Sequence, residues 1–170
     1  MIKQIDTNGL VQSDLLGRYF EASHDLSKLS SSNFIRRFMF SIYEKLFSEN
    51  TIMFEIYTEE RVVRDIDNLS KDTRKGIRYS KDSLYWIGYI YEYWSYTYSI
   101  PLWKVYKLIK PDELNDMYFI HHTFDPAKAI SRMIEAKGIK INKSYEELYV
   151  VYDQIVKARL KREKERRLIR

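Results

Sequence analysis

The sequence predicts an all-α protein: a single compact domain of about seven helices around a central aromatic helix, with a basic helix at the C-terminus. Five glycines and three prolines in 170 residues leave few positions for the tight turns of an all-β fold. Apolar residues recur at three- and four-residue spacing through much of the chain, which is typical of amphipathic helices. Helix-capping residues precede several of these apolar segments.

The first half of the chain is expected to hold three helices. Apolar spacing predicts helices near 10–24 and 32–48. Residues 51–57 fit either a short strand or the edge of a helix. A threonine followed by two glutamates predicts a helix from 58 to about 69, because threonine caps helices and acidic side chains favour their positive end. The polar residues 70–80 are expected to form a loop.

The second half begins with the aromatic helix, expected at about 81–98. Ser99 and Pro101 predict the start of a further helix, since serine is a good N-cap and proline fits the first turn. That helix is expected to stop before Pro111, which opens a short helix with the sequence PDELNDMY.

Two more helices are expected towards the C-terminus. Asp125 followed by Pro126 repeats the pattern of a cap and then a proline, and predicts a helix closed by Gly138. Ser144 and Glu147 form an S-x-x-E capping box that leads the last helix.

The aromatic helix contains eight Tyr or Trp among the fifteen residues LYWIGYIYEYWSYTY at 84–98. It is apolar nearly all round, which is typical of a buried central helix. Gly88 predicts that a neighbouring element packs closely, because glycine costs about 1 kcal/mol in a helix interior. Eight Tyr and Trp polar groups are more than one small domain encloses easily, so we expect a flank around Glu92, Tyr96 and Tyr98 to be exposed.

Such a flank predicts a partner surface, because Tyr and Trp are enriched at binding hot spots. The predicted partner-binding residues are Glu92, Tyr93, Tyr96, Tyr98 and Trp103. No catalytic residue, cofactor site or metal site is predicted. The five glycines do not form a phosphate-binding loop or a dinucleotide fingerprint, and no H-E-x-x-H motif is present.

The positive charge of the chain is concentrated at its C-terminus. Residues 157–170 hold eight Lys or Arg and two Glu, which leaves 21 basic and 22 acidic residues in 1–156. We therefore expect a helical domain over 1–156 and a basic helical tail over 157–170. The tail is a candidate for binding DNA through its phosphates, although a charge run is also compatible with simple solvation. Its candidate nucleic-acid-binding residues are Lys157, Arg159, Lys161, Arg162, Arg166 and Arg167.

The absence of Cys excludes disulfides and thiol catalysis and fits a reducing compartment. The opening residues MIKQIDTNGL lack the apolar run of a signal peptide. The aromatic segment is too short and too rich in Tyr to span a bilayer. A soluble, cytoplasmic protein is expected; the sequence leaves its oligomeric state open.

Three segments, YWIGYIYEYWSYTY, VYKLIKPDEL and HHTFDPAKAI, resemble the core of a group of short proteins from Gram-positive bacteria, which reads close to LYWxGYIYRYW…LYKxxKPxEL…YHTxDPxxAI. The likeness is dense over 84–134, looser over 15–46 and absent in the tail. Members of this group are encoded beside ADP-ribosyltransferase-like toxins and are regarded as antitoxins. The resemblance therefore implies a protein that binds and silences a cognate toxin, without catalysis.

The resemblance implies a role and no mechanism, because none of its positions is established as catalytic. Two departures from the pattern are Glu92, where the group often has Arg, and the turn at 100–103, which is commonly rich in Ser. The matching positions are Tyr85, Trp86, Gly88, Tyr89, Tyr91, Tyr93, Trp94, Tyr106, Lys107, Pro111, His122, Thr123, Asp125 and Pro126.

Two alternative functions remain open. Arg18 and His24 enclose five residues and satisfy the loose R-x(4–6)-H pattern of helical HEPN ribonucleases, a pattern that also arises by chance in a chain so rich in Arg. A DNA-binding transcriptional regulator that uses the basic tail is the other alternative, and it is compatible with the antitoxin role.

Overall fold

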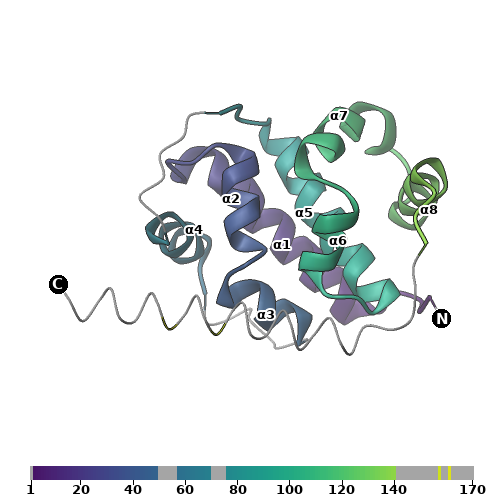
Figure 1. Cartoon of the computed structure of the whole chain (residues 1–170), viewed down its shortest axis with the longest axis horizontal. Helices are drawn as coiled ribbons and strands as arrows, with labels where there is room; N and C mark the ends of the chain where they lie inside the picture. Colours follow the sequence, from purple (N-terminus) through teal and green to yellow (C-terminus); the bar gives the residue numbers. More distant parts are fainter. Residues whose placement is uncertain (1, 50–56, 70–75, 141–156, 158–160, 162–170) are drawn as a thin grey trace.

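Eight α-helices and no strand make up the part of the chain that the computed structural model describes, residues 2–49, 57–69, 76–140, 157 and 161 (Figure 1). The all-α class is confirmed. The helices are α1 (Thr7–Leu26), α2 (Ser31–Phe38), α3 (Ile42–Ser48), α4 (Glu59–Asn68), α5 (Lys81–Tyr98), α6 (Leu102–Leu108), α7 (Pro111–His121) and α8 (Pro126–Lys137).

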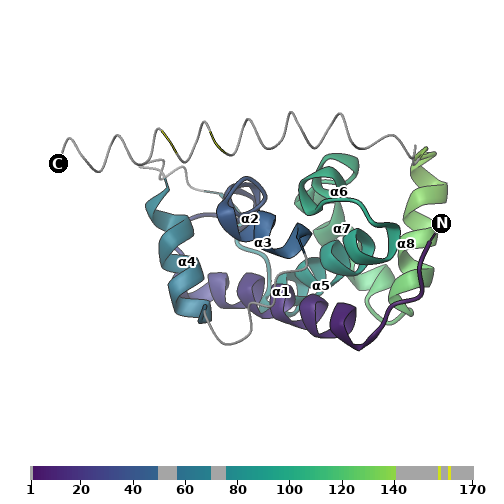
Figure 2. The same cartoon turned by 90° about the horizontal axis from the view of Figure 1, so that it is seen from below.

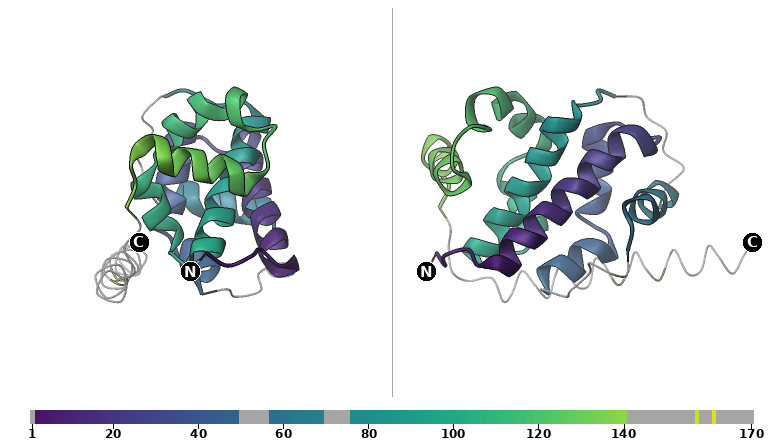
Figure 3. Two further views of the ribbon diagram at one scale, coloured as in Figure 1. Left: turned by 90° about the vertical axis from the view of Figure 1, so that its right-hand side faces the viewer. Right: turned by 180° about the vertical axis from the view of Figure 1, so that it is seen from behind.

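Helices α1 and α5 form the central pair of the fold and lie side by side in opposite directions (Figure 3). Gly9 near the start of α1 lies against the Tyr96 ring near the end of α5, whereas Gly17 lies against Tyr85. A Cβ atom built on Gly88 would lie 2.5 Å from the carbonyl oxygen of Leu16. The close packing predicted from Gly88 is therefore confirmed, and its partner is the backbone of α1.

The other helices pack around this pair. Helices α2 and α4 pack on α1, helices α6, α7 and α8 pack on α5, and α3 packs against α2, α5 and α6. Figure 2 shows α4 and α8 at opposite ends of the molecule. The core between them is strongly aromatic; its largest fully buried side chains are Trp94, Tyr19, Tyr91, Phe20, Phe34 and Phe38.

The single helix expected over 32–48 is wrong: the chain breaks between α2 and α3. Ser41 has an extended backbone, and its hydroxyl oxygen accepts a hydrogen bond from the backbone N–H of Tyr43 at 3.2 Å. This N-cap gives the chain a second helix start inside a continuous apolar pattern. The break accounts for the eighth helix of the described residues, a part of the chain for which seven helices were predicted.

Ser99 ends α5 instead of opening α6, which corrects the predicted start of that helix. Its φ of 53° is left-handed, and the next amide, of Ile100, donates to the carbonyl oxygen of Ser95 at 3.1 Å. This six-residue closure is a Schellman motif, usually formed with glycine. Helix α6 starts after Pro101, whose fixed φ suits a residue at a helix start.

The other caps that fall on described residues are confirmed. Thr58 caps α4, Asp125 caps α8, and Gly138 closes α8 with a φ of 59°. Residues 76–80 contain no helix, as the predicted loop requires. Most of 51–57, the rest of that loop, the capping box at Ser144 and Glu147, and the boundary between 1–156 and the tail lie outside the described residues.

A hydrogen-bond network around the buried Tyr79 joins α2, α7 and the segment that leads into α5. Ser32 Oγ bonds the Tyr79 hydroxyl at 2.6 Å and donates to Asp112 at 2.7 Å, and the Tyr79 hydroxyl also donates to Asp112. Burial, and then this bond to Asp112, raise the pKa of Tyr79. The hydroxyl therefore stays a donor and fixes the position of a ring that is 4% exposed.

Tyr79→Phe should lower the free energy of unfolding by about 0.5–1.5 kcal/mol, because it removes the hydrogen bonds of a buried tyrosine to Ser32 and to the exposed carboxylate of Asp112. Urea denaturation followed by far-UV circular dichroism measures this loss. Tyr98→Phe is the matched control: Tyr98 is half-buried and its hydroxyl has no hydrogen-bond partner among the described residues. Equal effects of the two substitutions would contradict a structural role of the network.

Candidate functional site

The flank of α5 that the sequence marks as a partner surface is largely covered. Glu92 is 1% exposed, Tyr96 is 8% exposed, and Tyr93 and Trp103 are buried as well. Tyr98 is half-buried. The expectation of an exposed flank around Glu92, Tyr96 and Tyr98 is therefore wrong, and a partner would reach little of these five side chains.

The N-terminal segment covers this flank. The Lys3 amide donates to the carbonyl oxygen of Thr97 at 2.8 Å, and the Lys3 ammonium lies 3.7 Å from the centre of the Tyr96 ring. Asp6 accepts a hydrogen bond from the Tyr96 hydroxyl at 2.7 Å while it caps α1 through the Gly9 amide. The Gly9 amide first, and then Tyr96, lower the pKa of Asp6, so the carboxylate that fastens the segment stays ionised.

The most exposed large apolar side chains of the described helices lie together on α7. Phe119 is 82% exposed and Ile120 is 64% exposed, and we call these two residues the α7 patch. They point outward because other residues of α7 pack on the core. Leu114 is fully buried, and the Tyr118 ring packs against Trp86 with centroids 5.8 Å apart.

Cationic side chains occur beyond the C-terminal end of the α7 patch. In the segment that follows α7, the Phe124 ring packs against His121, with centroids 5.6 Å apart. The guanidinium of Arg132 lies 4.4 Å from the centre of the Phe124 ring, and the Lys128 ammonium lies 5.8 Å away. Both cations are exposed on α8, so the end of α7 combines apolar side chains with positive charge.

The sequence contains a signal for the α7 patch that its analysis did not use. Residues 117–120 read MYFI, four consecutive apolar residues in a short helix. A helix that packs on one side needs about half of such a run, because consecutive residues point about 100° apart. Two of these four residues must therefore face away from the core.

A second feature that sequence reasoning missed is a pair of buried glutamates. Glu44 on α3 is fully buried, and its Oε1 accepts from Ser48 Oγ at 2.6 Å and from the Trp103 amide at 3.2 Å. Burial raises the pKa of Glu44 to about 8. Burial and the nearby Glu44 raise the pKa of Glu92 well above its usual range. Both therefore keep their protons to a higher pH than an exposed glutamate does.

No family model, curated protein or solved structure matches this chain. The resemblance of residues 84–134 to antitoxin-like proteins therefore stays a prediction. What the chain does has to be argued from its own surfaces and buried groups.

The structure does not bring Arg18 and His24 into one site. The Arg18 guanidinium binds Glu59 at 2.7 Å and Asp14 at 3.1 Å, whereas His24 Nδ1 binds Asp25 at 2.8 Å. Each side chain thus has acidic partners of its own: Asp14 on α1 and Glu59 on α4 for Arg18, and Asp25 at the end of α1 for His24. The helical ribonuclease alternative gains no support from this geometry.

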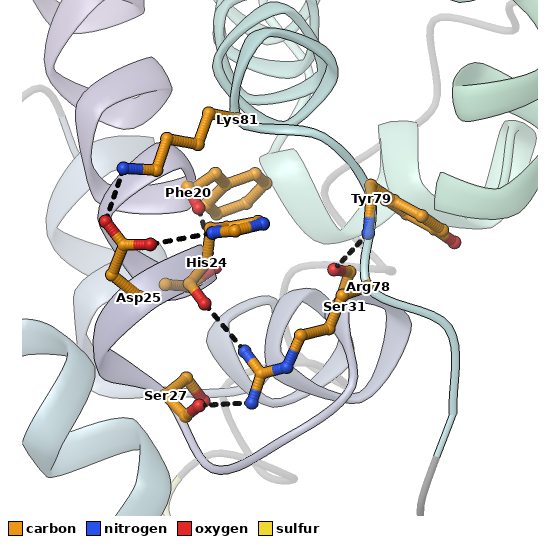
Figure 4. Close-up of polar contacts among 9 residues, drawn as sticks. Phe20, His24, Asp25, Ser27, Ser31, Arg78, Tyr79 and Lys81 are labelled. Carbon is orange, nitrogen blue, oxygen red and sulfur yellow. Dashed lines mark hydrogen bonds and ion pairs between the residues drawn. The ribbon is translucent and has the colours of Figure 1, made fainter.

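His24 belongs to a polar cluster that fastens the end of α1 to the start of α5 (Figure 4). Asp25 binds both His24 and Lys81. Arg78 donates to the carbonyl oxygens of His24 at 2.8 Å and Ser27 at 2.6 Å. These carbonyls lie at the negative end of α1, where a cation is stabilising, so the arrangement is that of a helix terminus.

Cofactor, membrane and nucleic-acid features are sparse in the described part of the chain. There, His, Asp and Glu side chains form no group able to hold a metal ion. None of its helices is both long and apolar enough to cross a bilayer. Lys157 and Lys161 are helical and exposed. The other predicted nucleic-acid-binding residues, Arg159, Arg162, Arg166 and Arg167, lie outside the described residues.

Proposed function

We propose that this protein is an antitoxin-like binding protein that neutralises a cognate protein toxin by direct contact in the cytoplasm, without a reaction of its own. The observation that supports this proposal is the α7 patch. Covering a Phe or Ile side chain contributes roughly 1.5–3 kcal/mol, and Phe119 and Ile120 obtain almost none of this within the fold. A partner would supply it.

The α7 patch lies within residues 84–134, the stretch that resembles antitoxin-like proteins. On that basis an ADP-ribosyltransferase-like toxin is the proposed partner. The positive charge of Lys128 and Arg132 at the end of α7 favours a toxin surface with an apolar depression beside acidic side chains. The aromatic helix α5 then acts as the scaffold that holds α7 in place, through Trp86 and Tyr118.

Replacing both patch residues, Phe119→Ser with Ile120→Ser, should weaken binding to the toxin by about 100-fold or more, because two anchor side chains are lost. The test is co-expression with the product of the adjacent gene, co-purification, and rescue of growth. Ile77→Ser is the matched control, since Ile77 is 77% exposed but lies before α5.

Circular dichroism of the double variant establishes that its fold is intact. A folded double variant that still co-purifies with and silences the toxin would contradict the α7 patch as the contact surface. An adjacent gene product that is neither toxic nor bound by the wild-type chain would contradict the antitoxin role itself.

A further inference from the structure

A cavity of about 130 Å³ lies between the end of α5, the turn before α6 and the N-terminal segment. Its volume approaches that of a roughly 150 Å³ cavity that holds benzene, but its lining is polar, which makes it unlike a dry apolar void. Lys3 and Ser99, both exposed, bring the cavity to the surface. The lining side chains that matter below are Lys3, Ser48, Glu92, Ser95, Tyr96 and Ser99.

Glu92 is the group in this lining that lacks a partner. It is 1% exposed, and its Oε2 has no hydrogen-bond partner among the described residues. A buried carboxyl oxygen that no protein group satisfies costs free energy, because the protein does not replace its lost hydration. Its position in the wall of a ligand-sized cavity suggests that the missing partner is a molecule that enters the cavity.

Glu44 strengthens the acidic character of the same wall. Its Oε1 is occupied by Ser48 and the Trp103 amide, while its Oε2 has no partner among the described residues. Ser48 contacts the cavity and Glu44 together. Two buried carboxyls therefore lie at or directly behind one wall, and Glu49 is a third acid that acts on Glu44.

Lys3 is the cation of the lining, and it is held at the N-terminal segment. Its ammonium lies 3.7 Å from the centre of the Tyr96 ring, an attraction between a cation and the negative face of the ring. Its charge lowers the pKa of Glu92, but Glu92 Oε2 has no hydrogen-bond partner among the described residues. The Tyr96 ring thus already accepts an ammonium group at the cavity, while the carboxyl beside it stays unpaired.

We propose that this cavity binds a small organic cation, an alkylammonium group, with Glu92 as its charge partner. An ammonium carries three N–H donors, and the lining offers the Glu92 carboxylate and the hydroxyl groups of Ser95 and Ser99. The group is supplied either by a free amine or by a lysine side chain of another protein. This site is separate from the α7 patch and does not rest on the proposed function.

Binding is coupled to the loss of a proton. Burial and Glu44 raise the pKa of Glu92, whereas Lys3 lowers it, so the empty cavity favours the protonated acid. Pairing with an ammonium favours the carboxylate, so the Glu92 proton passes to the buffer as the cation enters. The affinity for the cation should therefore rise with pH, over the range in which the alkylammonium itself remains charged.

Isothermal titration calorimetry of the full chain with methylammonium chloride, at about pH 8 and against sodium chloride of equal ionic strength, tests the proposal. Two buffers of different ionisation enthalpy reveal the proton released. We expect binding that is about tenfold or more weaker in Glu92→Gln, which keeps the shape of the neutral acid. Lys3→Ala should bind about two- to fivefold more tightly, because the Tyr96 ring that the Lys3 ammonium occupies becomes available to the ligand.

Glu60→Gln, a change of an exposed acid on α4, is the control and should bind like wild type. Acetyl-lysine amide separates the two sources: binding equal to that of methylammonium identifies a protein side chain, and binding of methylammonium alone identifies a free amine. The proposal is overturned if methylammonium gives no more heat than sodium, if Glu92→Gln binds equally well, or if tetramethylammonium, which has no N–H, binds equally well. If Glu92→Gln does not fold, two other measurements test the proposal: the proton released by the wild-type protein on binding, and the tighter binding expected of Lys3→Ala. The absence of both overturns it.

Discussion

Glu44→Gln should remove much of the loss of stability that the wild-type protein suffers as the pH rises from acid to neutral. Burial raises the pKa of Glu44 from 4.5 to about 8, so the folded state holds this proton more tightly than the unfolded state does. The stabilisation is complete below about pH 4.5 and is lost as the pH rises towards 8. At about 1.4 kcal/mol per pH unit, the loss by neutral pH is on the order of 3 kcal/mol.

Glutamine reproduces the neutral acid, because its amide oxygen accepts from Ser48 and Trp103 as Glu44 Oε1 does. Urea denaturation from about pH 5 to pH 8.5 measures the effect. The variant should match wild type at the acid end and exceed it at the alkaline end, whereas Glu60→Gln should follow the wild-type curve. Glu92 is unchanged in this variant and still makes stability fall as the pH rises. If stability falls equally with pH in Glu44→Gln and wild type, Glu44 is not the source of the effect.

Gly88→Ala should destabilise the protein by about 1–3 kcal/mol, although alanine normally stabilises a helix interior. The added Cβ would lie 2.5 Å from the Leu16 carbonyl oxygen and 2.9 Å from the Gly17 Cα. These are backbone atoms of α1, so the two central helices must separate to admit the methyl group. In a helix without this neighbour the same change would gain about 1 kcal/mol, and the sign of the effect is therefore diagnostic.

Urea denaturation of Gly88→Ala, with near-UV circular dichroism to follow the buried Trp and Tyr rings, measures this effect. Asp82→Ala is the control, since Asp82 is exposed in the first turn of the same helix and its replacement should change stability by less than about 1 kcal/mol. A Gly88→Ala protein as stable as wild type would mean that α1 and α5 do not approach as closely as described.

The features that were correctly predicted from sequence depend on local chemistry. The bounds of α5 were predicted from its continuous apolar pattern. The side chain of Ser80 caps the helix at the predicted start. Thr58, Asp125 and Gly138 act within a few residues of their own positions. Signals of this kind are present in any window of the chain that contains them.

The features that were not predicted depend on residues far apart in the chain. The cover over α5 needs Asp6 to meet Tyr96, and no property of the segment 84–98 reveals that partner. Glu92 looks like a solvent-facing charge in an apolar helix, whereas its neighbourhood with Glu44 on α3 makes it a buried neutral acid. The helix start at Ser41 was not predicted, because the apolar spacing continues across this residue.

The pairing of α1 with α5 also determines when this fold can form. Helix α1 is synthesised first, but the helix that covers Gly9 and Gly17 begins only at Lys81. Until α5 has left the ribosome, α1 can pack only on α2 and α4, and its glycine face remains open to water. Such long sequence separation slows folding relative to bundles of neighbouring helices, and the nascent chain exposes the inner face of α1 to chaperones during that interval.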